Sequence, residues 1–220
     1  MSEVKAKILV VDDEPSIRTS LSLLLKESGY SVSTAENGLD ALSSFRNELP
    51  DILISDLYMP GMTGFELTSV VRRRFPAVLI VAMSGAFRDD KVPAGVVADA
   101  FFPKGSNVSR LLRILQSLNL EDGAMRGRMA LADIPIWIQP SGYDRAGSAQ
   151  IAICCPECLR VAWETDAGPG GEVREATCVH CRTRILYSIV PTLDSASSQV
   201  LQKGRSRGLF RMAEAPHFQY

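Results

Sequence analysis

The stretch from Leu53 to Leu67, LISDLYMPGMTGFEL, decides the fold of this chain. An apolar run reaches Ser55 and Asp56, a Met-Pro-Gly turn follows, and the apolar residues then take a helical spacing. Asp is common in turns, so an Asp at a strand end is often only a loop former. At the carboxyl ends of parallel strands, however, side chains from several strands meet in one crevice. The role of Asp56 therefore depends on the strands around it.

Short apolar runs alternate with helical patterns from Lys7 onward. Between them, Pro15 suits a first helical position, Asn37 suits an N-cap, and Thr63 and Glu66 have the spacing of a capping box. Each run is short and rich in Val, Ile or aromatic residues, as strands are: KILVVDD, YSVSTA, DILISD, AVLIVAMSG and ADAFFPK. This alternation predicts an α/β fold, a doubly wound five-stranded parallel sheet covered by helices on both faces.

The connection between the fourth and fifth runs, AFRDDKVPAGVVADA, is irregular. Pro93 and Gly95 stand where the interior of a helix would lie. Proline removes a helical hydrogen bond and glycine weakens a helix, so we expect any helix in this connection to be short or broken.

Polar side chains end four of the five predicted strands. Asp12 and Asp13 end the first strand and Asp56 ends the third, which brings three carboxylates to one edge. Like charges at such distances either take up protons or hold a cation, and oxygen ligands without His or Cys favour Mg²⁺. Ser84 and Lys104 end the fourth and fifth strands and add a hydroxyl and an ammonium group. The combination suits phosphoryl transfer.

Four of these motifs, in this order, resemble the receiver domain of bacterial response regulators over residues 5–120. They are ILVVDDEP, ISDLYMPGMTG, VAMSG and AFFPKG. The resemblance implies a flavodoxin-like fold and makes Asp56 the phosphoacceptor, with a histidine kinase as the phosphoryl donor. Ser84 would bind the phosphoryl group, Lys104 would bridge to it, and Phe101 would be the aromatic switch residue. The implied Mg²⁺ ligands are Asp12, Asp13, Asp56 and the backbone carbonyl of Tyr58.

Three positions leave alternatives open or depart from the family pattern. Phe102 points to the opposite face from Phe101, so either could be the buried aromatic residue and Phe101 could be core rather than switch. The family usually has Pro directly after the lysine, whereas here Pro103 precedes Lys104 and a glycine follows it. Tyr58 is bulky for its place and could hinder the water that hydrolyses the acyl phosphate.

All five cysteines lie between Cys154 and Cys181, and their spacing is typical of a structural zinc site. CPEC and CVHC are separated by nineteen residues, and this segment resembles a zinc ribbon. Unligated core thiols and a redox C-x-x-C pair are the alternatives. Cys154 would be the spare thiol, and His180 a solvated residue between two ligands. The predicted Zn²⁺ ligands are Cys155, Cys158, Cys178 and Cys181.

Composition and charge bound the remaining possibilities. Of the 220 residues, 46% are hydrophobic, which is enough for a buried core. The net charge of -1 gives too little positive charge to imply a nucleic-acid partner by charge alone. No apolar run approaches the roughly 20 residues that cross a bilayer, so we expect a cytoplasmic protein without a membrane partner. We predict a receiver domain at 1–122, a linker at 123–150 in which IPIWIQP would be an isolated strand, a zinc-ribbon-like domain at 151–191 and a flexible tail at 192–220.

Together these features predict a two-component response regulator that is not an enzyme in the turnover sense, although the receiver catalyses its own phosphorylation. The zinc ribbon would dock on a downstream protein. The alternative is a nucleic-acid-binding transcriptional regulator that uses the ribbon and the basic stretch QKGRSRGLFRM. Because of Pro93 and Gly95, any phosphorylation-linked homodimer should differ from the usual family arrangement.

Overall fold

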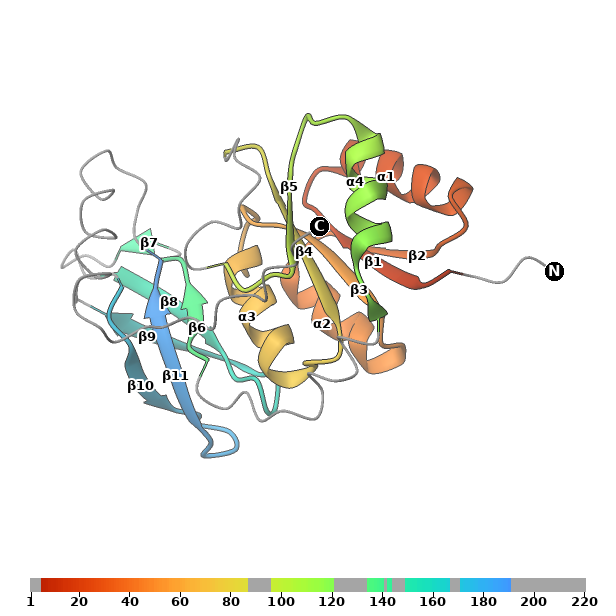
Figure 1. Ribbon diagram of the computed structural model, residues 1–220. Helices are drawn as coiled ribbons and strands as arrows, with labels where there is room; N and C mark the ends of the chain where they lie inside the picture. The colour runs from red at the N-terminus through yellow and green to blue at the C-terminus, as the bar shows by residue number, and fades with distance from the viewer. Residues whose placement is uncertain are drawn as a thin grey trace, which may run out of the picture. The chain divides into compact units, whose positions relative to one another are not determined.

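Five parallel strands form a sheet in the order β2-β1-β3-β4-β5 (Figure 1). This is the order of flavodoxin-like doubly wound sheets, in which the strand order across the sheet reverses between β1 and β3. The strands are β1 (Lys7–Val11), β2 (Ser31–Ala35), β3 (Ile52–Asp56), β4 (Leu79–Ser84) and β5 (Ala100–Pro103). The computed structural model describes residues 5–86, 96–120, 134–140, 142–143, 149–166 and 171–190.

Of the four described helices, three begin where the sequence predicts their first turns. Pro15 lies in the first turn of its helix, and the Asn37 side chain accepts a hydrogen bond from the Asp40 N–H at 2.9 Å. The Thr63 hydroxyl accepts from the Glu66 N–H at 3.4 Å. The helices are α1 (Pro15–Glu27), α2 (Gly38–Asn47), α3 (Gly64–Arg74) and α4 (Val108–Ser117).

Alternate residues of the strands face opposite sides of the sheet, and each side is covered by two helices. Ile8, Val10 and Ile54 pack in the cluster that contains residues of α1 and α4. Leu9 and Leu53 pack in the cluster that contains residues of α2 and α3. The predicted doubly wound α/β fold of the receiver segment is confirmed.

The irregular connection before β5 is described only at its ends. Val96 is buried, and residues 96–99 contain no helix. Residues 87–95, with Pro93 and Gly95, lie outside the described part of the chain. The expectation of a short or broken helix there is therefore untested.

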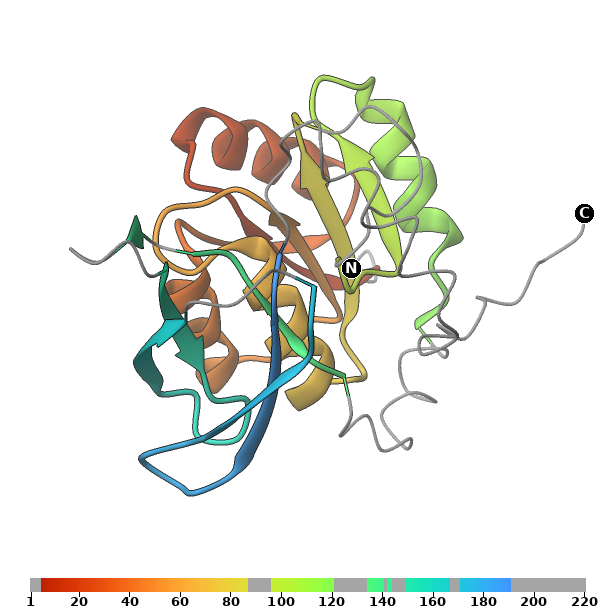
Figure 2. The ribbon, with the colours of Figure 1, turned by 90° about the vertical axis from the view of Figure 1, so that its left-hand side faces the viewer.

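The C-terminal half of the described chain is rich in β structure and forms two three-stranded sheets, here called the β module. The sheets have the orders β10-β11-β6 and β7-β8-β9, and the β10–β11 hairpin is drawn in blue in Figure 2. The strands are β6 (Ile136–Ile138), β7 (Gly142–Tyr143), β8 (Ala149–Cys154), β9 (Val161–Asp166), β10 (Arg174–Thr177) and β11 (Arg184–Ile189).

One expectation about this region is wrong. The strand predicted in IPIWIQP exists as β6, but it is not isolated, because it pairs in parallel with β11 and Trp137 lies beside Ser188. Part of the predicted linker 123–150 therefore belongs to a sheet. The other domain limits stay predictions, and the expected tail at 192–220 lies outside the described residues.

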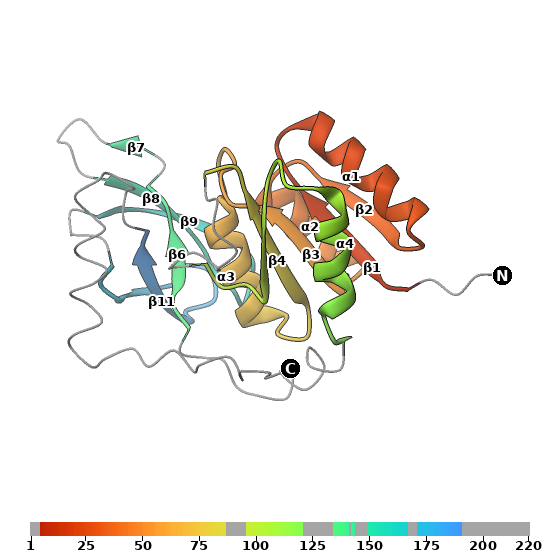
Figure 3. The ribbon, with the colours of Figure 1, turned by 45° about the horizontal axis from the view of Figure 1, so that its top comes forward.

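Helix α3 is shared between the receiver sheet and the β module. Figures 1 and 3 both show it flanked by β4 on one side and β6 on the other. Every residue from Gly64 to Arg72 is buried. Among them, the guanidinium group of Arg72 pairs with Asp99 at 2.6 Å, which satisfies a charge that burial would otherwise make costly. None of the described helices is long and apolar enough to cross a bilayer.

Candidate phosphoacceptor site and metal centre

Three carboxylates meet at the carboxyl edge of the parallel sheet. Strands β1 and β3 are neighbours, with Val11 beside Ser55, so the residues that follow them come together. One oxygen from each of Asp12, Asp13 and Asp56 lies within 4.8 Å of the others. Asp12 and Asp56 are buried, and Asp13 is exposed to solvent. Such an all-oxygen group, open on one side, fits Mg²⁺ that keeps part of its water shell.

Lys104 joins the two buried carboxylates. Its Nζ lies 2.7 Å from Asp12 Oδ2 and 2.7 Å from Asp56 Oδ2. Burial works to lower the pKa of Lys104, but hydrogen bonds and charges from both carboxylates outweigh it and raise the pKa. The side chain therefore stays an ammonium group at neutral pH. Burial, helped by the charge of Asp12, raises the pKa of Asp56 against the opposing effect of Lys104. A bound cation would relieve that penalty.

The loop after β1 holds Asp12 in place through two further contacts. The Glu14 N–H donates to Asp12 Oδ1 at 3.0 Å, and Arg18 Nη1 donates to the Asp12 carbonyl oxygen at 2.5 Å. Arg18 was not among the site residues predicted from the sequence. Its place in the first turns of α1, directly after the Asp12–Asp13 pair, is the signal that could have indicated it.

Gly64 is a second residue near the site that was not predicted from the sequence. A Cβ atom at this position would lie 1.9 Å from the backbone oxygen of Asp56, and the Gly64 N–H donates to the Leu57 carbonyl at 3.0 Å. The first turn of α3 therefore packs directly on the backbone of the candidate phosphoacceptor. A glycine immediately after an N-cap residue was the available signal.

Ser84 and Lys104 lie at the ends of adjacent strands. Ser84 is buried, and its carbonyl accepts from the Lys104 N–H at 2.8 Å. The Ser106 N–H closes a turn onto the Pro103 carbonyl at 3.1 Å, with Gly105 at a φ of +84°. Proline could not adopt that φ, so a glycine after the lysine matches the turn observed here.

The two adjacent phenylalanines pack on opposite faces of the sheet, and both are buried. Phe102 belongs to the α1 and α4 face. Phe101 lies in a small cluster with Leu57, Phe65, Ala82 and Val96, against which the Tyr58 side chain also packs. The Tyr58 and Phe65 rings meet edge to face at 5.6 Å. The placement of Phe101 is that of a core residue near the site, and its switching role stays a prediction.

The four predicted zinc ligands come together in the β module. Sγ of Cys155 lies 3.6 Å from Sγ of Cys181, and Sγ of Cys158 lies 3.7 Å from Sγ of Cys178. All four sulfur atoms lie within 4.8 Å of one another. Zinc with four sulfurs at about 2.3 Å gives a tetrahedron with edges of about 3.8 Å. The spacing of the thiols fits that geometry.

The two C-x-x-C turns repeat the same backbone arrangement. In the first, the Cys155 N–H donates to the Arg160 carbonyl at 2.9 Å and the Leu159 N–H donates to the Cys155 carbonyl at 2.8 Å. The corresponding bonds of the second turn, from Cys178 to the Thr183 carbonyl and from Arg182 to the Cys178 carbonyl, are both 2.9 Å.

The residue after each turn has an unusual backbone conformation. Leu159 and Arg182 have φ values of 56° and 61°, which non-glycine residues seldom adopt. The same costly conformation in two equivalent places indicates a constraint shared by both turns, and common metal ligation would supply it.

Cys154 and His180 lie outside the group of four thiols. Cys154 is fully buried, and its backbone N–H donates to Glu66 Oε1 at 2.8 Å. His180 is exposed. Burial raises the pKa of the Cys155 thiol to about 12, so a metal ion would have to displace a proton there.

One family model matches the first half of the chain. Residues 8–116 match the response regulator receiver domain family. The chain is 32% identical over 144 residues to the alkaline phosphatase synthesis transcriptional regulatory protein PhoP of Bacillus subtilis, covering 59% of this chain and 60% of that protein. It therefore spans less than two thirds of that relative.

Two solved structures of response regulators are each similar to half of this chain. The chemotaxis response regulator CheY4 of Vibrio cholerae is 34% identical, with 50% of this chain and 96% of that chain covered and a TM-score of 0.45. The response regulator TrrA from Thermotoga maritima, in complex with Mg(2+)-BeF, is 35% identical, with 50% and 96% covered and a TM-score of 0.46. Residues 8–116 of this chain are a response regulator receiver domain.

Proposed function

We propose that the protein is a two-component response regulator that accepts a phosphoryl group on Asp56 from a histidine kinase. The observation that carries this proposal is the position of the Asp56 carboxylate. It lies 2.7 Å from Lys104 Nζ and shares a group of three carboxylates with Asp12 and Asp13.

Each side chain has a defined part in the transfer. An oxygen of Asp56 attacks phosphorus, the P–O bond forms as the P–N bond of a phosphohistidine breaks, and the imidazole nitrogen keeps the electron pair. Lys104 holds an oxygen of the moving group by its positive charge, and the Ser84 hydroxyl donates to another oxygen once the group has arrived. Phosphoryl transfer of this kind depends mainly on positioning and charge neutralisation.

Mg²⁺ would be held by the three carboxylates, with the backbone carbonyl of Tyr58 as a further ligand. When bound, it supplies positive charge that neutralises the incoming phosphoryl oxygens. The burial of Asp12 and Asp56 and the exposure of Asp13 support this ligand set, because an ion can enter from the solvent side.

The four cysteines would hold one structural Zn²⁺. Four thiolates close the coordination shell and leave no position for a reactive water, so we assign no catalysis to this site. The β module has small sheets, and metal binding would contribute to its folding free energy.

The β module is the proposed output part, which docks on a downstream protein. Exposed apolar side chains on it support protein docking, since Trp163 is 68% and Val179 73% exposed. The nucleic-acid alternative is favoured by three exposed cations around the cysteine turns: Arg160, Arg182 and Arg184.

Any phosphorylation-linked homodimer is expected to differ from the usual family arrangement. Small-angle scattering of the phosphorylated protein would test this expectation.

The test of the phosphoacceptor uses a small phosphodonor. With Mg²⁺ and acetyl phosphate, the intact mass of the protein should increase by one phosphoryl group, and Asp56→Asn should abolish the increase. Asp40→Asn changes an exposed carboxylate on α2 and should be modified like the wild type. Modification that survives in Asp56→Asn would refute the assignment.

A further inference from the structure

Helix α3 supplies hydrogen-bond partners to the backbone of the β module. Three side chains of this helix form hydrogen bonds with backbone groups on three different strands, β8, β6 and β11. The pairs are the Cys154 N–H with Glu66 Oε1 at 2.8 Å, the Trp137 N–H with Ser69 Oγ at 3.3 Å, and Arg73 Nη2 with the Arg184 carbonyl at 3.3 Å. The Glu66 bond is buried, so a shift of the module along the helix would leave a buried carboxylate and a buried N–H unpaired.

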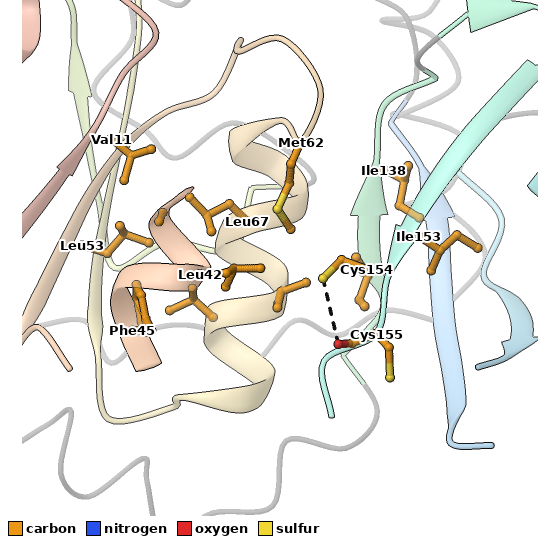
Figure 4. Packing of buried hydrophobic residues seen from close by; sticks show 14 of the residues in the cluster. Val11, Leu42, Phe45, Leu53, Met62, Leu67, Ile138, Ile153, Cys154 and Cys155 are labelled. Carbon is orange, nitrogen blue, oxygen red and sulfur yellow. Dashed lines mark hydrogen bonds between the residues drawn. The ribbon is translucent and has the colours of Figure 1, made fainter. Parts of the chain in front are cut away.

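Apolar packing is continuous across the same contact. One buried cluster contains Leu67 and Val70 of α3 together with Ile138 and Ile153 of the module. Figure 4 shows Leu67 on the helix side and Cys154, Ile138 and Ile153 on the module side. The module thus covers the face of α3 that points away from the parallel sheet, and the two share one core.

A second cluster brings the module to the candidate phosphoacceptor. Leu57, which follows Asp56 directly, packs with Phe65 and Phe101, and Trp137 of β6 packs against this cluster from the module side. Phe101 lies on β5, which ends at Pro103, the residue before Lys104. Trp137 therefore packs against the same cluster as Leu57, the residue that follows Asp56.

We propose that the β module responds to phosphorylation of Asp56 through its contacts with α3 and through Trp137. Phosphorylation loosens the contact between the β module and the receiver. The inference rests on the proposed function of Asp56. It identifies the chain's own module as the first partner of the receiver.

The direction follows from the available space and charge. Asp56 is 5% exposed, and the first turn of α3 lies against its backbone, so a phosphoryl group, with phosphorus and three further oxygens, cannot enter without displacement nearby. Lys104 would follow the added negative charge and pull on the strand that carries Phe101. Packed clusters respond to such changes by switching between arrangements rather than by stretching.

Tryptophan fluorescence of the full-length chain tests the proposal. The protein has two tryptophans, so Trp163→Phe leaves Trp137 as the reporter. Adding Mg²⁺ and beryllofluoride, which mimics the phosphoryl group, should raise acrylamide quenching of Trp137 about twofold. The same addition should have no effect in Trp163→Phe with Asp56→Asn. The Trp137→Phe chain, which reports the exposed Trp163, should show no change either.

Fluorine NMR of bound beryllofluoride separates the two hypotheses. Bound beryllofluoride with unchanged or reduced quenching of Trp137 overturns the inference and leaves the proposed function standing. Absence of binding at Asp56 removes both.

The coupling between Asp56 and the β module can also be tested in the opposite direction, by weakening the contact and measuring the affinity for beryllofluoride. If phosphorylation loosens the contact, weakening the contact must in turn favour beryllofluoride binding. Ser69→Ala removes the acceptor of the Trp137 N–H and should tighten beryllofluoride binding several-fold. Ser43→Ala removes a similar hydroxyl, which donates to the Leu39 carbonyl four residues back on α2, and should leave the affinity unchanged. Equal affinities of Ser69→Ala and wild type would contradict the proposal.

Discussion

Gly64 lies so close to Asp56 that a Cβ atom on Gly64 would be 1.9 Å from the Asp56 backbone oxygen. The clash would involve backbone atoms, which cannot rotate away as a flexible side chain can. The position of the phosphoacceptor and the position of α3 are therefore set together.

Gly64→Ala should destabilise the protein by about 1–3 kcal/mol and slow phosphorylation of Asp56, because α3 and the end of β3 must move apart. Chemical denaturation and the rate of acetyl phosphate modification measure the two effects. Gly85→Ala is the matched control, since a Cβ at Gly85 meets no atom within 4 Å. Equal stability of Gly64→Ala and wild type would show that the close approach is absent in solution.

Glu66 should make stability depend on pH. Burial raises its pKa from the ordinary 4.5 to about 8, against the opposing effect of the Cys154 N–H. The folded state then binds a proton more tightly than the unfolded state. Its contribution to stability is full below about pH 4.5 and is lost as the pH rises through about 8.

Glu66→Gln keeps an oxygen acceptor for the Cys154 N–H and cannot ionise. We expect the variant to be more stable than wild type by about 1–3 kcal/mol above the raised pKa and nearly equal below the ordinary one. Urea unfolding at several pH values measures this. Exposed Glu164, changed to Gln, should show no such difference. A constant difference across the pH range would mean that Glu66 does not titrate there.

Removal of the metal from the cysteine site should unfold the β module while Asp56 still accepts phosphoryl. Soft thiolates suit Zn²⁺ and hard carboxylates suit Mg²⁺, so a zinc-selective chelator should affect only the former. We expect release of about one equivalent of zinc, as for a single four-thiolate site, and protease cleavage within residues 151–191. Loss of phosphorylation under the same treatment would argue against separate sites.

Cys155→Ser and Cys181→Ser should each lose the metal, since each removes one of four ligands. Cys154→Ala should retain it, because the Cys154 thiol lies outside the group of four. The zinc content of each purified variant shows whether the metal is lost or retained. Metal loss in Cys154→Ala would change the ligand assignment.

Tyr58 should affect the lifetime of the phosphorylated state. Its half-buried ring packs on Phe65 beside Asp56 and would obstruct the approach of water to the acyl phosphate. Tyr58→Asn should therefore dephosphorylate faster, by about tenfold, which corresponds to about 1.4 kcal/mol of activation free energy. An unchanged decay rate, measured by intact mass over time, would exclude this role.

The sequence by itself determined the parallel sheet, the helix starts and the grouping of polar residues at one edge. These features depend on local periodicity and on the rule that parallel strands end on the same side, which neighbouring residues alone express. Asp12, Asp56 and Lys104 were predicted correctly as neighbours for this reason. The equal spacing of the two cysteine pairs was likewise visible without coordinates.

The tertiary structure decided what covers α3. The Thr63–Glu66 spacing predicted a capping box, yet only the Thr63 hydroxyl caps the helix, while the Glu66 carboxylate accepts from Cys154, 88 residues away in sequence. The parallel pairing of β6 with β11 is similarly non-local. A local pattern specifies which face of a segment is buried, but the partner is chosen by packing among distant segments, since burial contributes the same free energy against any apolar surface of the right shape.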